Sequence, residues 1–194
     1  MARGRPSKKA HIIDAACGLF TKQGYQSTSI DQVVLTAAVS KPTVYSNFPT
    51  KLVLWENVVE SLIERAKEDM DAALTSLQSG LKTTDDEALV AGWIMLWQAW
   101  VAKQERLAVY RVLLGEQHKM AESTVALFDQ FEAVLESVLT KWLEAFNVTL
   151  MAFFALKAIS KEALLMPALL HQESMSSKKL IQQLNALIKN NKIR

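Results

Sequence analysis

Residues 28–54 read TSIDQVVLTAAVSKPTVYSNFPTKLVL, and this stretch decides the fold because it predicts two short helices joined by a tight turn. Thr28 or Ser29 caps the first helix, since a hydroxyl can accept a backbone N–H that the helix start leaves unpaired. Ser40 caps the second helix in the same way, and Pro42 lies in the first turn of that helix, where no helical hydrogen bond is lost. The pattern predicts a helix-turn-helix.

The second of these helices has an apolar side, formed by Val44 and Phe48, and a polar side. Cationic, hydroxyl and amide side chains can reach phosphates and base edges in a major groove, where this motif places its second helix. The alternative is a generic helical hairpin with a solvated polar face. We favour DNA binding because capping, turn and polar face coincide in one window. The polar side consists of Lys41, Thr43, Ser46 and Asn47.

From about residue 10 to residue 60 the sequence resembles the TetR family of bacterial transcriptional regulators. The matching strings are IDAA (13–16), LF (19–20), GY (24–25), TSI (28–30), VSK (39–41) and TVY (43–45), followed by Phe48, Lys51 and Leu54 within FPTKLVL (48–54). The resemblance implies an all-α homodimer of about nine helices, with a three-helix DNA-binding domain at 1–52 and a ligand-binding and dimerisation domain at 53–194. It also implies site roles: Thr28, Ser29, Tyr45 and Lys51 would hold phosphates, whereas Lys41, Pro42, Thr43 and Asn47 would face the bases.

One position departs from the family pattern, because Ala38 stands where a glycine usually precedes the Val-Ser pair. We expect a left-handed backbone there. A side chain in that conformation costs on the order of 1 kcal/mol, which is too little to forbid the turn.

The N-terminal end is basic. Residues 1–51 carry seven Lys or Arg against two Asp, a net charge of +5, whereas the remainder carries −3. Positive charge at one end suits a polyanion. Arg3 and Arg5, in the string RGRP, resemble the core of an AT-hook, in which arginines lie along a narrow minor groove. The alternative is a disordered tail that attracts phosphates without specificity.

Beyond residue 54 the sequence is helical and rich in aromatic residues. Thr84 and Glu87 predict a capping box, and Pro167 is expected to end or kink a helix. Aromatic side chains could enclose a pocket for a small apolar or aromatic effector, with Arg111, Gln117 or His118 orienting it, or they could simply fill the core. The candidates for ligand binding are Trp93, Trp97, Trp100, Tyr110, Arg111, His118, Phe128, Phe131, Trp142 and Phe154.

The last helix has an apolar stripe opposite lysines and glutamines, and such a stripe needs a partner surface. Together with the apolar run 151–159 it predicts a four-helix interface across a two-fold axis. Two recognition helices would then lie about 34–36 Å apart, or a multiple of that, on a near-palindromic operator. The candidates for dimerisation are Met151, Phe154, Leu180, Ile181, Leu184, Leu187 and Ile188.

Other classes of function find no support. Cys17 is the single cysteine, so no intrachain disulfide can form, which fits the cytoplasm; its apolar neighbours favour a buried side chain over a redox sensor. No apolar run has the length of a membrane span, and no catalytic, cofactor or metal-binding motif is found. We therefore expect a cytoplasmic transcriptional regulator, a repressor that an effector releases from DNA. The alternative is a helical ligand-binding protein or enzyme that binds no DNA.

Overall fold

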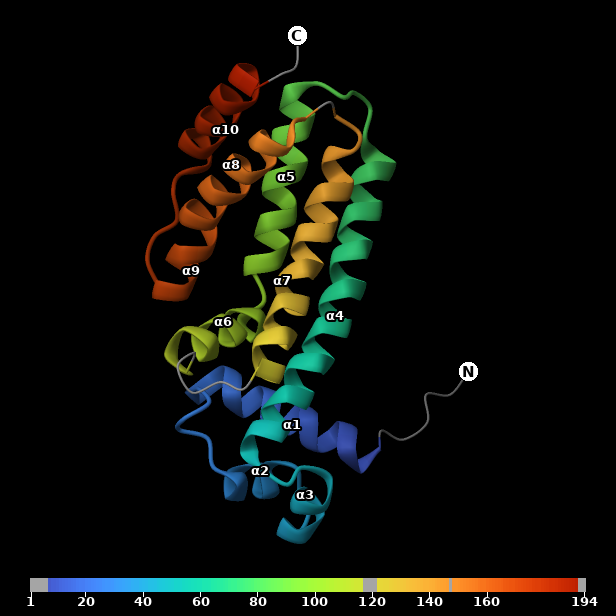
Figure 1. Cartoon of the computed structure of the whole chain (residues 1–194), viewed down its shortest axis with the longest axis vertical. Coiled ribbons are helices and arrows are strands. Elements are labelled where there is room, and N and C mark those ends of the chain that lie inside the picture. The colour runs from blue at the N-terminus through green and yellow to red at the C-terminus, as the bar shows by residue number, and fades with distance from the viewer. Residues whose placement is uncertain (1–6, 117–121, 147, 192–194) are drawn as a thin grey trace. The chain divides into compact units, whose positions relative to one another are not determined.

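The computed structural model describes residues 7–116, 122–146 and 148–191, and these residues form helices and no strand (Figure 1). The π-helix η2 joins α8 to α9 without a break, so the described residues form nine continuous helical segments. The expected all-α fold is confirmed. The elements are α1 (Lys8–Gln23), α2 (Ile30–Thr36), α3 (Lys41–Asn47), α4 (Lys51–Gly80), α5 (Asp86–Val101), α6 (Gln104–Glu116), α7 (Glu122–Leu143), α8 (Leu150–Ser160), η2 (Lys161–Leu165), α9 (Met166–Leu170) and α10 (Ser177–Asn191).

The chain divides into two compact units. The first unit comprises Met1–Arg65 and Gln104–Phe131, and the second comprises Ala66–Lys103 and Glu132–Arg194. The first unit thus groups α6 and the start of α7 with α1–α3. That residues 1–52 form a domain of their own stays a prediction.

Hydroxyl caps define the short helices of the first unit. The Ser29 Oγ accepts the Gln32 N–H at 3.2 Å, and the Gln32 side chain accepts the Ser29 N–H at 2.7 Å, which is a complete capping box. The Ser40 Oγ accepts the Thr43 N–H at 3.3 Å. Between these helices Ala38 has φ 49°, so the left-handed turn residue expected from the sequence is confirmed.

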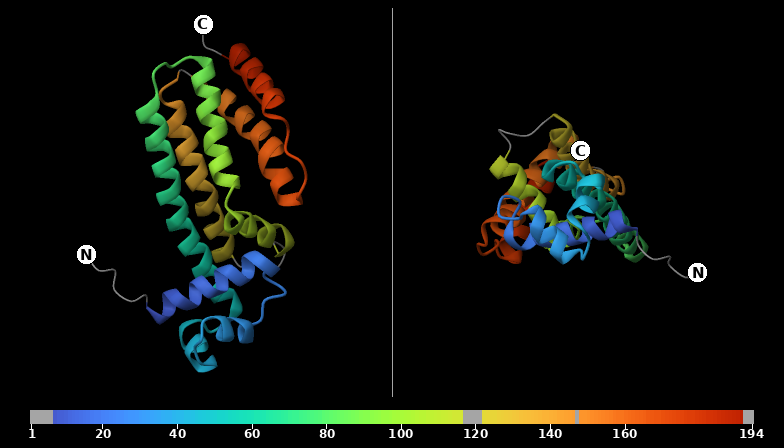
Figure 2. Two further views of the ribbon diagram at one scale, coloured as in Figure 1. Left: turned by 180° about the vertical axis from the view of Figure 1, so that it is seen from behind. Right: turned by 90° about the horizontal axis from the view of Figure 1, so that it is seen from below.

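In the second unit, α10 packs on α5 and α8, as the views in Figures 1 and 2 agree. The Trp142 ring lies against Gly92, where an added Cβ would come within 2.1 Å of it. The Trp142 Nε1 also donates to the Leu89 carbonyl oxygen at 3.0 Å, which fixes the ring in place. The predicted cap of α5 is one residue off, because Asp85 rather than Thr84 is its N-cap.

The π-helix η2 explains how the chain passes Pro167. A proline in a helix lacks its N–H and clashes with the carbonyl four residues earlier. In η2 the Met166 N–H instead bonds to the Lys161 carbonyl oxygen, five residues back, and this wider turn precedes Pro167 in the first turn of α9. The helix therefore continues to Leu170, so of the two predicted alternatives, an end or a kink, the end at Pro167 is excluded.

None of the helices in the described residues combines the length and the hydropathy that crossing a membrane requires.

Candidate nucleic-acid interface

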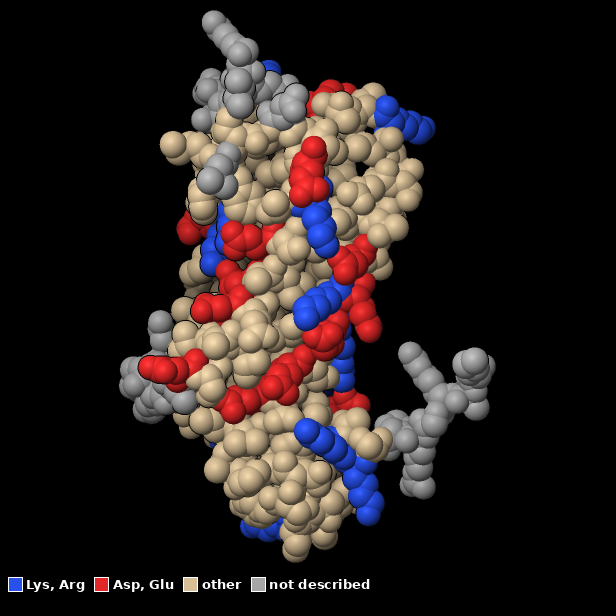
Figure 3. Space-filling view, turned by 45° about the vertical axis from the view of Figure 1, so that its right-hand side comes forward, with Lys and Arg blue, Asp and Glu red and all other residues tan. Residues whose placement is uncertain are grey.

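Helix α3 presents its polar side to solvent. Lys41, Pro42, Ser46 and Asn47 are exposed and Tyr45 is 43% exposed, while Thr43 is half-buried. The opposite side is fixed by Val44 and Phe48, both fully buried. On the face shown in Figure 3, the end of the first unit that carries α2 and α3 displays Lys or Arg and no Asp or Glu. The structure thus brings the predicted base-facing residues of α3 onto one exposed surface.

Local hydrogen bonds order this surface. The hydroxyls of Ser40 and Thr43 lie 2.7 Å apart. The Ser46 hydroxyl and the Asn47 amide both donate to the Thr43 carbonyl oxygen, at 3.0 and 2.8 Å. A base edge must therefore compete with bonds inside the helix for these donors.

Lys41 has a partner that the sequence analysis missed. Its Nζ lies 2.8 Å from an Asp31 carboxylate oxygen, and both side chains are more than half exposed. The hydrogen bond and charge of Asp31 raise the pKa of Lys41, so the ammonium stays protonated across the physiological range. Lys41 is one residue beyond the N-cap of α3, and Asp31 is in the first turn of α2. The ion pair joins the two helices of the motif and competes with DNA for the lysine.

The residues predicted to hold phosphates differ in accessibility. Ser29 and Tyr45 are exposed, whereas Thr28 is only 2% exposed. The Thr28 hydroxyl donates to the Gly24 carbonyl oxygen at 2.8 Å and accepts from the Gln23 amide at 3.2 Å. Its hydroxyl therefore stabilises the turn between α1 and α2. In this conformation it is not open to a phosphate, contrary to the expectation.

Lys51 also has a structural role. Its Nζ donates to the Thr28 carbonyl oxygen at 2.9 Å and to the Gln26 carbonyl oxygen at 3.3 Å, and it lies 4.4 Å from the centroid of the Tyr25 ring. The ammonium thus joins the start of α4 to the turn before α2. A lysine 23 residues from its partner gives no local sequence signal, so only the fold reveals this contact.

The arginines of the basic arm, Arg3 and Arg5, lie outside the described residues, as do Gln117 and His118. Their predicted contacts stay predictions.

The predicted ligand-binding residues fall into both units. In the second unit Trp93, Trp97, Trp100 and Trp142 are buried, and the Trp93 Nε1 donates to the Ser160 Oγ at 2.8 Å. Among the described residues the Trp97 Nε1 has no hydrogen-bond partner, which is unusual because an unpaired buried donor costs about 1–3 kcal/mol.

The other predicted ligand-binding residues include three in the first unit whose aromatic rings contact one another. The Tyr110 ring centroid lies 5.7 Å from that of Phe128 and 5.5 Å from that of Phe131. Arg111, also in the first unit, is half-buried, and Phe154, in the second, is 58% exposed. The predicted set is therefore divided between the two units.

The predicted dimerisation residues divide into a buried group and an exposed group. Leu180, Leu184 and Ile188 are at most 2% exposed within the chain, where α10 packs on α5 and α8. Their expected contact with a partner is therefore wrong, because their own chain already covers them. Leu187 is half-buried. The exposed members of the set are Met151, Phe154 and Ile181, at 74%, 58% and 41%.

Cys17 is 9% exposed, and burial raises the pKa of its thiol. A thiol with a raised pKa is a poor nucleophile near neutral pH. This favours the buried structural side chain over the redox sensor.

Comparisons with known proteins agree with this geometry. Residues 12–58 match the family described as bacterial regulatory proteins, tetR family. The HTH-type transcriptional regulator YhgD of Bacillus subtilis, itself uncharacterised, is 34% identical over 67 residues, which are 34% of this chain and 35% of that protein. The HTH-type transcriptional activator FasR of Mycolicibacterium smegmatis is 28% identical over 82 residues, 42% of this chain and 34% of that protein.

The match therefore spans about a third of the length of these curated relatives. The fold is similar over nearly the whole chain. A crystal structure of a putative TetR-family regulator from Mesorhizobium loti superposes with a TM-score of 0.70 at 20% identity and covers 94% of both chains. With the capped α2–α3 pair and the exposed polar side of α3, these similarities show that residues 12–58 form a domain like that of the tetR family of bacterial regulatory proteins, and that the chain shares the fold of the Mesorhizobium loti protein.

Proposed function

We propose that the chain is a sequence-specific DNA-binding transcriptional regulator of the cytoplasm. The observation that carries this proposal is the surface of α3, where charged, hydroxyl and amide side chains are exposed on a capped helix whose apolar side is buried. In this proposal Lys41 and Thr43 read base edges, and Ser29, Tyr45 and Lys51 position the protein on phosphates.

The test begins with selection of bound fragments from the source genome, followed by fluorescence anisotropy on a selected and a scrambled duplex. Lys41→Ala or Thr43→Ala should lose preference at particular base pairs, worth about 1–3 kcal/mol each. Tyr45→Phe should instead weaken binding to both duplexes alike. If all three variants changed both affinities equally, the division into reading and positioning residues would be wrong.

The regulator acts as a homodimer in this proposal. Met151 and Phe154 on α8 are large apolar side chains left exposed by their own chain, together with Ile181 on α10. We expect Met151→Glu with Phe154→Glu to produce a monomer by light scattering and to weaken operator binding. Met95→Glu is the matched control, because Met95 is also an exposed methionine of the second unit, at 54%. A dimeric double variant would place the interface elsewhere.

We expect repression, released by a small apolar or aromatic effector. Aromatic residues in both units support an effector of this kind, and the unpaired Trp97 N–H supports one that carries a hydrogen-bond acceptor. A ligand releases DNA only by binding more tightly to the form that does not bind DNA. The test is a hydrophobic compound library, measured by tryptophan emission and melting temperature; a library that changes neither would favour a plain core.

A further inference from the structure

A surface groove lies in the first unit between α1, α4 and α6. Its volume is about 530 Å³, which is sufficient for a small organic molecule. One face of α1 forms the floor of the groove, because the lining residues of α1 recur at the spacing of a single helix side. Arg65 on α4 and Glu105 on α6 form the walls. The floor consists of Asp14, Cys17, Gly18, Thr21 and Lys22.

Gly18 keeps the floor of the groove open. It lies inside α1, and a glycine inside a helix destabilises that helix relative to alanine. The packing of the chain does not require it, because a Cβ added at Gly18 would meet no atom within 4 Å. That Cβ would instead occupy the groove. A molecule that lies on α1 would explain the missing side chain, whereas the contacts within the chain do not.

The cationic wall of the groove can bind a second carboxylate. The Arg65 guanidinium forms an ion pair with the Asp14 carboxylate, and both side chains are about half exposed. A guanidinium carries five N–H donors, and one carboxylate takes at most two of them. Arg65 therefore keeps donors for a carboxylate that enters the groove.

The anionic wall of the groove lacks a counter-ion. Glu105 is half-buried in the first turn of α6, and within the part of the chain that the structure describes it makes no hydrogen bond or ion pair. A partly buried carboxylate loses part of its hydration, which a bound ammonium would offset. Burial raises the pKa of the Cys17 thiol most, and the charge of Arg65 lowers this pKa while that of Glu105 raises it, so both charges reach the floor.

The charge balance and the floor limit the chemistry of a ligand. The groove is lined by two cationic and two anionic side chains, so its charges cancel and it suits a molecule with no net charge. Opposite charges on the two walls suit a zwitterion, and the part of the floor at Cys17 and Gly18 carries no charged group. A ligand that matches these features has a carboxylate, an ammonium and an apolar side chain.

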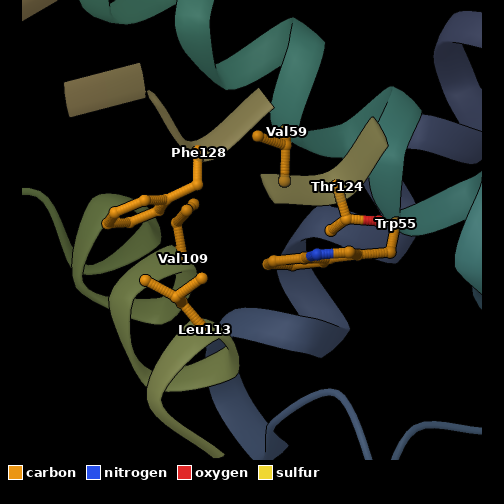
Figure 4. A pocket seen from close by; sticks show the side chains of 6 residues that line it. All are labelled: Trp55, Val59, Val109, Leu113, Thr124 and Phe128. Atoms are coloured by element: carbon orange, nitrogen blue, oxygen red, sulfur yellow. The ribbon is translucent and has the colours of Figure 1, made fainter. Parts of the chain in front are cut away.

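The cavity drawn in Figure 4 lies elsewhere in the same unit, between α4, α6 and α7, where Trp55 and Phe128 are among the lining residues. Its volume of about 10 Å³ is room for about one water molecule. This cavity is therefore too small to take a ligand of the size that the groove admits.

We propose that the groove is a binding site for a free α-amino acid with an apolar side chain. The carboxylate of the amino acid accepts from the Arg65 guanidinium, its ammonium donates to the Glu105 carboxylate, and its side chain lies on Gly18 beside Cys17. The site is distinct from the tryptophans of the second unit. It does not rest on the proposed DNA binding, because neither its charges nor its floor requires DNA.

The first test is isothermal titration calorimetry of the full chain with L-leucine, which should bind saturably. Two matched probes each lack one charge: 3-methylbutylamine keeps the ammonium, and 4-methylpentanoate keeps the carboxylate. Each should bind about tenfold or more weakly than leucine, because each leaves one charged wall without its partner. No saturable binding of leucine, or equal affinity for leucine and for either probe, overturns the proposal.

The second test uses variants of the groove. Gly18→Leu fills the floor and should weaken leucine binding about tenfold or more without lowering the melting temperature. Glu105→Gln removes the charge that holds the ammonium and should weaken leucine binding by a similar factor. Glu60→Gln is the matched control, because Glu60 is a glutamate of the same unit that does not line the groove, and it should bind leucine as the original chain does. Unchanged leucine affinity in Gly18→Leu, or equal affinity in the two glutamine variants, overturns the site.

Discussion

Replacing Lys51 by Met should loosen the turn before α2 while keeping most of the side-chain volume. The change removes the hydrogen bonds to the Gln26 and Thr28 carbonyl oxygens and the contact with the Tyr25 ring. A charged hydrogen bond contributes about 1.5–3 kcal/mol and an exposed cation–π contact about 0.5–1 kcal/mol. Because Lys51 is only half-buried, water can replace the ammonium in part, and we expect a total loss of about 2 kcal/mol.

For a chain of this length the loss corresponds to a fall in melting temperature of about 4–8 °C, measured by circular dichroism. Lys22→Met is the control, because Lys22 is an exposed lysine in the last turn of α1 and its loss changes the net charge equally. The control should stay within about 0.5 kcal/mol of the original chain. Equal melting temperatures for the two variants would refute the structural role of Lys51.

The same Lys51 variant shows whether the ammonium contacts a DNA phosphate directly or only holds the turn before α2 in place. Loss of one phosphate contact lowers the salt dependence of DNA binding by about one unit of slope. If Lys51 only holds the turn, its substitution weakens DNA binding, but the dependence of that binding on salt stays the same as in the original chain.

Three further predictions concern stability and affinity. Ala38→Gly should stabilise the chain by about 1 kcal/mol in urea denaturation because φ is 49° there, whereas Ala37→Gly, with a right-handed backbone, should destabilise it. Gly92→Ala should destabilise by about 1–3 kcal/mol through overpacking, measured the same way, whereas the unobstructed Gly18→Ala should stabilise by up to about 1 kcal/mol. Asp31→Asn should tighten binding to any duplex in anisotropy titrations, because it removes an anion and releases Lys41; weaker binding would show that the ion pair orders α3 for DNA.

Local chemistry in the sequence predicted the DNA-binding helices well. The caps at Ser29 and Ser40 and the left-handed residue at Ala38 are confirmed, because each depends on a few neighbouring residues. The same holds for the division between the inward and outward sides of α3.

Contacts between distant residues could not be predicted in this way. The stripe on α10 correctly indicated an apolar surface, but periodicity alone does not say whether the covering helix belongs to the same chain. In the structure α5 and α8 cover Leu184. The ion pair of Lys41 with Asp31 and the bonds of Lys51 to the turn likewise depend on how helices pack. Thr28 was mispredicted for the same reason. Its hydroxyl has the chemistry to bind a phosphate, but the fold buries it.

The proposed function requires that α3 reads DNA sequence. The most direct measurement is the affinity of the full chain, as a function of salt, for a genome-selected duplex and for a scrambled duplex of equal length. If α3 reads sequence, the logarithm of each affinity falls linearly with the logarithm of the salt concentration, and the selected duplex binds at least about a thousandfold more tightly than the scrambled one at physiological salt. Equal affinity for the two duplexes, or no binding to either at low salt, would contradict it.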